Sequence, residues 1–278
     1  MTVANAVEIY LSDLSVAGRA KGTLELYRYL LKALAKAMGP RRTLASIRRE
    51  DMVRFLAAFK QRGSAQSYIN LVAHVTKSFW AWSMRQGYVC SNPMAGMILP
   101  RDHPQPRRPF SKNEVARLIA VANTPLAHAI LLILLDTGIR ASELAGLQLG
   151  DVDFESNTLT IHGKGDKTRF VALNPRPREA LVAYLVSRPQ HDGTIWPERF
   201  NRKTLAYLLD GVGRQAQVAP IFPHRFRNTF ACAFLASTGN PLALQAILGH
   251  SSLSMTARYV AVAQAGMALE VHRQHPLT

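Results

Sequence analysis

The sequence predicts a mainly α protein with a small antiparallel β-sheet, an α+β fold, divided into two domains. Three observations support this prediction. Apolar residues recur at helical spacing through residues 1–98. A basic, proline-rich segment, residues 100–109, then interrupts the pattern and cannot form a helix. Beyond it, residues 152–173 alternate as strands do before helical patterns return.

The first domain is expected to be a compact bundle of four short helices. Thr2 and Thr23 can cap the first two helices, and Gly39-Pro40 stops the second. The expected helices cover residues 2–16, 23–38, 49–60 and 64–86.

The second domain begins at a capping box in which Ser111 can accept from the Glu114 N–H while Glu114 reaches back. Residues 126–135 are apolar throughout and suit a buried central helix. Three strands are expected over residues 152–154, 158–162 and 168–173. Further helices are expected over residues 177–187, 203–217, 223–237, 241–248 and 254–265. We therefore expect a helical domain over 1–99, a semi-rigid linker over 100–110 and a second domain over 111–278.

The composition points to a large anionic partner, and nucleic acid comes first. The 278 residues hold 34 Lys and Arg against 18 Asp and Glu, a formal charge of +16. Residues 1–108 hold 17 of these basic residues against six acidic ones, so the helical domain carries most of the positive field. A membrane partner is disfavoured, because the sequence has neither an apolar run of about 18 residues nor a signal pattern. Two cysteines without ligand spacing suggest neither a zinc site nor a disulfide scaffold.

Arginines gather around the turn before the third helix, with no acids expected to balance them. We interpret them as contacts to DNA phosphates, together with two arginines of the linker. The alternative is a solvated charged face. The candidate DNA-binding residues are Arg41, Arg42, Arg48, Arg49, Arg54, Arg107 and Arg108.

Cationic side chains in the second domain suit attack on a phosphodiester. The transition state gains negative charge on its non-bridging oxygens, and arginine offers a planar, always-charged fork to meet it. Arg140 and Arg227 are the candidates. Lys164, at a Gly-Lys-Gly turn, can reach into a groove and donate a proton to a leaving oxygen. The alternative for Lys164 is an ordinary basic turn.

Tyr259 is the candidate nucleophile. Tyrosine has an unperturbed pKa of about 10, so it needs nearby positive charge or a base. His224 and His250 can act as that base or bond the phosphate. Taken alone, each of these three is more often a core or surface residue. The acids are scattered, and no metal-ligand motif occurs, so we expect neither a metal nor another cofactor.

Together, these residues resemble the tyrosine recombinase, or phage integrase, family. That family has the order Arg, Lys, His-x-x-Arg, His, Tyr, matched here by Arg140, Lys164, His224, Arg227, His250 and Tyr259. Residues 137–144 match its Thr-Gly-x-Arg-x-x-Glu-Leu motif, and residues 163–169 match its Gly-Lys-Gly-x-Lys-x-Arg hairpin. The tyrosine follows a Leu-Gly-His by nine positions, as in the family. The length is similar to compact Xer-type members, although Asn228 stands where those relatives usually have histidine.

The resemblance implies a site-specific DNA recombinase with a helical core-binding (SAM-like) domain and a catalytic domain that form a C-shaped clamp on duplex DNA. Tyr259 would form a 3′-phosphotyrosyl link, Arg140, Arg227 and His250 would stabilise the transition state, Lys164 would protonate the 5′ oxygen, and His224 would assist as base. Metal and ATP would not be needed. A homotetramer on two DNA sites would pass through a Holliday junction, with a tail helix at residues 265–271 docked on a neighbour. The alternative for this tail is a helix that packs on its own domain.

Two alternatives stay open at this point. A type IB topoisomerase-like enzyme would use the same residues as a monomer without strand exchange, and a DNA-binding factor would leave the site inert. We expect the protein in the cytoplasm, associated with the nucleoid. A sister recombinase or accessory protein is a further candidate partner. The target DNA sequence and the biological process, whether chromosome-dimer resolution, mobile-element integration or plasmid resolution, are not readable from the chain.

Overall fold

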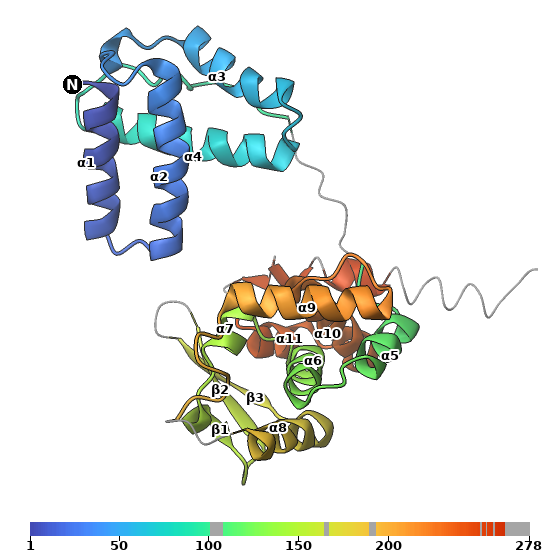
Figure 1. Cartoon of the computed structure of the whole chain (residues 1–278). Helices are drawn as coiled ribbons and strands as arrows, with labels where there is room; N and C mark the ends of the chain where they lie inside the picture. Colours follow the sequence, from blue (N-terminus) through green and yellow to red (C-terminus); the bar gives the residue numbers. More distant parts are fainter. Residues whose placement is uncertain are drawn as a thin grey trace, which may run out of the picture. The chain divides into compact units, whose positions relative to one another are not determined.

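The structure is a computed structural model that describes residues 1–100, 108–163, 167–188, 193–250, 252–253, 255–257 and 259–264. The chain divides into two compact units, Met1–Gln105 and Pro106–Thr278, and each is described by itself. The prediction of a mainly α fold with one small antiparallel sheet is confirmed (Figure 1).

The first unit is a bundle of four helices, as expected. Helices α1 and α2 lie side by side, and α4 runs across them (Figure 1). The aromatic rings of Phe79 and Trp80 on α4 are completely buried and pack edge-on, with centroids 5.4 Å apart. The elements are α1 (Val3–Val16), α2 (Lys21–Met38), a 3-10 turn η1 (Leu44–Ser46), α3 (Arg49–Gln61) and α4 (Gln66–Arg85).

The two predicted threonine caps have different outcomes. The Thr2 side chain accepts from the Asn5 N–H, so the first cap is confirmed. The second is wrong, because α2 begins at Lys21 with Ala20 as its N-cap, and Thr23 lies inside the helix. Gly18, with a φ of +70°, has already ended the turn after α1, and the chain re-enters helix two residues before Thr23.

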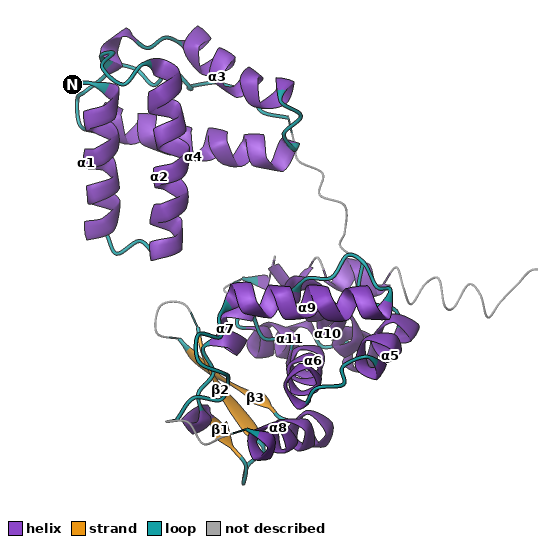
Figure 2. Ribbon diagram, in the orientation of Figure 1, coloured by secondary structure: helices purple, strands orange, loops and turns teal. Residues whose placement is uncertain are grey.

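The second unit combines helices with a three-stranded antiparallel sheet of order β1-β2-β3 (Figure 2). Leu159 faces Val152 on one side and Val171 on the other. The Ser111–Glu114 capping box is present. The helices are α5 (Lys112–Ala120), α6 (Pro125–Thr137), α7 (Ala141–Ala145), α8 (Pro175–Ser187), α9 (Arg202–Ala216), α10 (Pro223–Thr238) and α11 (Pro241–Leu248). The strands are β1 (Val152–Asp153), β2 (Thr158–His162) and β3 (Thr168–Ala172), and η2 spans Leu149–Asp151.

Helix α6 forms the centre of the second core, as its apolar sequence predicted. Its residues Ile130, Leu131 and Leu134 are fully buried, and α8 and α10 pack against it. The described residues 255–257 and 259–264 are helical and cover a smaller apolar cluster beside α10 and α11. None of the described helices is long and apolar enough to span a bilayer.

Candidate active site

The ends of two helices define the candidate active site. Helix α6 ends at Gly138 and α11 ends at Gly249, and both glycines adopt left-handed backbone conformations with φ near +60°. Arg140 follows α6 and caps α7, whereas Arg227 lies on the first turns of α10. Because α10 packs against both α6 and α11, these segments meet although Gly138 and Gly249 are 111 positions apart in sequence.

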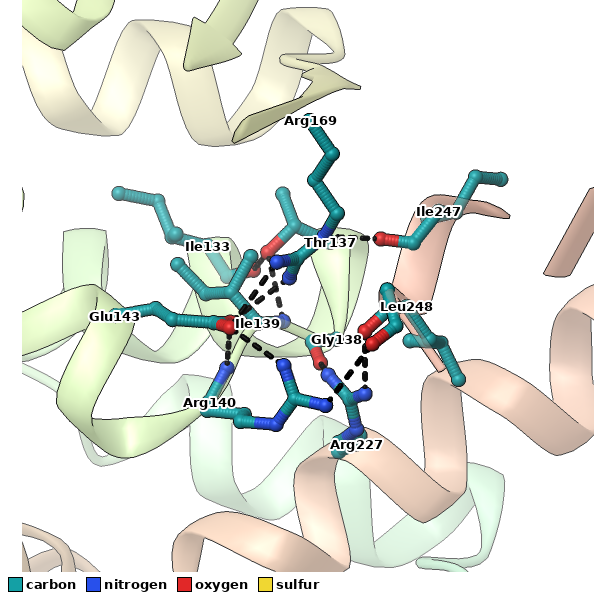
Figure 3. A network of polar contacts seen from close by, with 11 residues as sticks. Ile133, Thr137, Gly138, Ile139, Arg140, Glu143, Arg169, Arg227, Ile247 and Leu248 are labelled. Carbon is teal, nitrogen blue, oxygen red and sulfur yellow. Dashed lines mark hydrogen bonds and ion pairs between the residues drawn. The ribbon is translucent and has the colours of Figure 1, made fainter. Parts of the chain in front are cut away.

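A buried carboxylate holds two of the arginines. Glu143 accepts from Arg140 Nη1 at 2.6 Å and from Arg169 Nη1 and Nη2 at 3.0 and 2.8 Å (Figure 3). Glu143 also accepts from the backbone N–H of Arg140 at 2.7 Å, which fixes the start of α7. Burial acts to raise the pKa of Glu143, but the hydrogen bonds from Arg169 and Arg140 hold it at about 2. The carboxylate is therefore ionised at neutral pH.

Arg227 is buried and joins the two helix ends. Its Nη1 donates to the Gly138 carbonyl and its Nη2 to the Leu248 carbonyl, each at 2.7 Å (Figure 3). Burial, followed by the nearby charge of Arg140, lowers the pKa of Arg227 to about 10, so the guanidinium stays charged at neutral pH. The partial negative charge of helix C-termini compensates for part of that burial.

Three consecutive carbonyls at the end of α11 each accept from a different arginine. Arg169 Nε donates to Ile247 at 2.6 Å, Arg227 to Leu248 at 2.7 Å and Arg140 Nη2 to Gly249 at 3.3 Å. These carbonyls have no partner within the helix, so the arginines satisfy them. The bond from Arg140 is the longest of the three, and the Arg140 side chain is 38% exposed. Arg140 is thus the most open to an incoming anion.

His250 and Tyr259 stack beside this cluster. Their rings lie 5.9 Å apart between centroids and are inclined by 9°. His250 Nδ1 pairs with Thr256 Oγ1 at 2.9 Å. Tyr259 is only 4% exposed and packs with Leu244 and Leu248 of α11. Leu248 also supplies the carbonyl that accepts from Arg227 Nη2, so Arg227 and Tyr259 contact the same residue.

The sequence-predicted residues therefore fall into three groups. Arg140, Arg227, His250 and Tyr259 come together. His224 is exposed on the first turn of α10. Lys164 lies outside the described residues, and only the flanks of its turn are seen, where the Gly163 N–H donates to the Lys167 carbonyl at 2.8 Å.

The candidate DNA-binding arginines of the first unit differ in the partners of their side chains. The expectation of no balancing acid is wrong for Arg42 and Arg54, because buried Asp51 accepts from both, at 2.9 and 2.7 Å. Arg49 donates to the Ala95 carbonyl at 2.7 Å. Arg41 and Arg48 are exposed.

The two linker arginines have different outcomes. Arg108 lies in the second unit and pairs with Glu114 at 2.8 Å. Arg107 lies outside the described residues.

Two family models match the chain. The model of the phage integrase family matches residues 108–265, and that of the phage integrase N-terminal SAM-like domain matches residues 7–87. The chain belongs to the phage integrase family. It is therefore a tyrosine recombinase, an enzyme that breaks and rejoins DNA strands, and its partner is DNA.

The chain is similar in sequence to several Xer recombinases. The tyrosine recombinase XerA of Thermococcus onnurineus (strain NA1) is 28% identical over 92% of this chain and 90% of its own length. The tyrosine recombinase XerC of Xanthomonas campestris pv. campestris (strain B100) is 27% identical over 98% of this chain and 88% of its own. A lambda integrase tetramer bound to a Holliday junction shares the fold, with a TM-score of 0.78 at 18% identity over 93% of this chain and 77% of that one.

Sequence reasoning assigned no role to three side chains of this integrase site. Glu143 and Arg169 stand in the two family motifs, so the motifs themselves carried the signal. Thr256, which pairs with His250, lies outside the family motifs, and nothing in the sequence pattern indicated a role for it.

Proposed function

We propose that this family member cuts and rejoins DNA through Tyr259. The Tyr259 oxygen attacks the phosphorus, the bond to the 5′ oxygen breaks, and a 3′-phosphotyrosyl link forms. Lys164 gives the leaving 5′ oxygen its proton. A 5′-hydroxyl of the partner strand then attacks the same phosphorus and releases the tyrosine. The link conserves the energy of the phosphodiester, so the cycle balances without ATP.

The convergence of Arg140 and Arg227 is the observation that carries this proposal. Both guanidinium groups are charged and fixed by backbone carbonyls. Leu248, whose carbonyl accepts from Arg227, also packs against Tyr259. Donors held before the reaction stabilise developing charge on phosphate oxygens without reorganisation. We assign this role to Arg140 and Arg227. When DNA binds, Arg140 Nη2 exchanges its long hydrogen bond to the Gly249 carbonyl for one to a phosphate oxygen.

The two histidines have separate roles in the proposal. His250 uses Nδ1 for Thr256, which orients the ring so that Nε2 can serve a phosphate oxygen. His224 is exposed at the start of α10 and assists as the base that takes the tyrosine proton.

The nucleophile is covered in the structure. Attack on DNA requires the Tyr259 hydroxyl to reach phosphorus at bonding distance, and a side chain that is 4% exposed cannot receive a duplex. We therefore propose that the segment carrying Tyr259 shifts when DNA binds. As a consequence, the Tyr259 hydroxyl is shielded from other electrophiles while no DNA is bound.

DNA contact and assembly are further parts of the proposal. We propose that the domain of residues 1–99 binds the duplex through its exposed arginines and that the domain of residues 111–278 cuts it. Residues 100–110 link the two domains. Four copies act on two sites, as the lambda integrase tetramer on a Holliday junction suggests. In our proposal the tail at 265–271 docks on a neighbouring copy. The tail lies outside the described residues. We expect a nucleoid-associated, cytoplasmic protein, with an accessory or sister recombinase as a candidate partner.

A nicked suicide duplex tests the proposal. Cleavage next to the nick releases a short strand and traps the covalent complex, which survives denaturing detergent. We expect the wild-type protein to form this adduct and Tyr259→Phe to bind DNA without forming it. Cleavage by Tyr259→Phe would exclude Tyr259 as the nucleophile. Strand exchange between two duplexes would then separate a recombinase from a topoisomerase-like enzyme.

A further inference from the structure

The first residues of the second unit are bonded to the helix that carries His224 and Arg227. The Phe110 N–H donates to Thr229 Oγ1 at 2.8 Å across 119 positions of sequence. The Phe110 ring packs edge-on against the Phe226 ring, with centroids 4.9 Å apart. These contacts hold α10 against the segment that leads into α5.

Arg225 is the centre of this attachment. It follows His224 directly, and its side chain is 3% exposed. Its Nε donates to the Arg108 carbonyl at 3.2 Å, and its Nη1 donates to the Pro220 carbonyl at 2.7 Å. Its guanidinium carbon lies 4.0 Å from the centre of the Phe110 ring. One side chain therefore joins the entry to α10 with the start of the unit.

Glu114 balances the buried charge of Arg225. Arg225 Nη2 donates to both Glu114 oxygens, at 3.0 and 3.1 Å. Burial acts to raise the pKa of Glu114, but hydrogen bonds from the Ser111 backbone, Arg108 and Arg225 hold it at about 2. The pair is charged at neutral pH. Loss of either partner leaves a buried charge with weaker compensation, which the neighbouring backbone must move to relieve.

We propose that Arg225 and Glu114 are positioning residues for DNA cleavage. Together they hold the first turn of α10, and with it His224 and Arg227, in the geometry that the phosphate requires. Rates of enzymes depend on such placement, and a displacement of about 1 Å can cost on the order of a hundredfold. The inference rests on the proposed function, because it assumes that His224 and Arg227 act on the phosphate.

Three variants of the full chain test this inference on a nicked duplex that the wild-type protein cleaves. Arg225→Met removes the charge and all three donor nitrogens, and Arg225→Lys keeps the charge and part of the donation. Thr229→Val removes the acceptor for the Phe110 N–H and the donor to the Arg225 carbonyl. Arg214→Met is the matched control, since Arg214 pairs with Asp210 at 3.2 Å on the exposed surface of α9. The cleavage rate constant at saturating protein, the affinity from gel shifts and the melting temperature are measured for each.

We expect Arg225→Met to lower the cleavage rate constant by on the order of tenfold or more, with DNA affinity within about twofold of wild type. Arg225→Lys should recover part of the rate, Thr229→Val should lose less, and Arg214→Met should match wild type. A folded Arg225→Met protein that cleaves at the wild-type rate would overturn the inference. If Arg225→Met does not fold, wild-type rates for both Arg225→Lys and Thr229→Val would overturn it. If the wild-type protein cleaves the duplex and Tyr259→Phe does not, the proposed function stands. The Arg225 and Thr229 variants then test the positioning role alone.

Discussion

Arg227 is the buried cation on which the electrostatics of the site depend. Its two donors reach the ends of two helices, a geometry that the planar fork of arginine matches and the single ammonium of lysine does not. We expect Arg227→Lys to lower the cleavage rate constant by about a hundredfold while DNA affinity changes little. Single-turnover cleavage of the nicked duplex measures this, with Arg214→Lys as the control. An unchanged rate would exclude Arg227 from the transition state.

Glu143 links the stability of the second unit to pH. Its pKa in the folded protein is about 2, below its ordinary value of 4.5, so its ionised form stabilises the fold. That contribution is complete above about pH 4.5 and is lost as the pH falls toward 2. We expect Glu143→Gln to lower the free energy of unfolding at neutral pH by on the order of 3 kcal/mol. It should also weaken the dependence of stability on pH between 5 and 2.

Thermal or urea unfolding at several pH values tests this role of Glu143. The wild-type protein should still lose stability in acid through Asp51 and Glu114, whose pKa values are also about 2. The informative quantity is therefore the difference between wild type and Glu143→Gln, which should shrink as the pH falls. A difference that is constant with pH would contradict the assignment.

Two helices end at Gly138 and Gly239, and these ends allow the cost of the same glycine substitution to be compared in different surroundings. Both glycines end a helix in the left-handed conformation, with φ of +61° and +63°. A Cβ at Gly138 would lie 2.5 Å from Cδ1 of Phe230, whereas a Cβ at Gly239 would meet no atom within 4 Å. We expect Gly239→Ala to cost about 1 kcal/mol through backbone strain alone and Gly138→Ala to cost clearly more. Denaturant unfolding of both variants compares them, and equal losses would contradict this packing.

Local patterns predicted most elements because helices and strands depend on spacing within a few residues. The four helices of the first unit, the central α6 and the three strands all agree with their periodicity. The cap at Thr23 was wrong, because any of several residues after Gly18 could have started the helix. The short helix α7 was not predicted, since five residues are too few to show a period.

The contacts that build the site could be predicted only in part. Family motifs identified Arg140, Arg227, His250 and Tyr259. The arrangement in which three arginines bond three consecutive carbonyls joins residues as far as 109 positions apart. Periodicity reports which side chains are buried but not which of them meet. Asp51 was missed as a partner of Arg42 and Arg54 for the same reason, since its bonds depend on how α3 turns.

The net charge of +16 is a property of the whole molecule with a measurable consequence. Each phosphate neutralised on binding releases counterions, so the logarithm of DNA affinity should fall linearly with the logarithm of salt concentration. We expect the double variant Arg41→Gln/Arg48→Gln, which removes two exposed cations, to weaken binding and to lower this slope by about 0.9 per lost contact. Arg214→Gln serves as the control. An unchanged slope in the double variant would remove these arginines from the DNA interface.

Tyr259 is expected to form a covalent bond to DNA in the site built by Arg140 and Arg227. The most direct measurement is to isolate the adduct from the suicide duplex, digest the protein and sequence the DNA-linked peptide by mass spectrometry. We expect the nucleotide to be attached to the Tyr259 oxygen through a 3′ phosphate. Attachment at another residue, or at a 5′ phosphate, would contradict it.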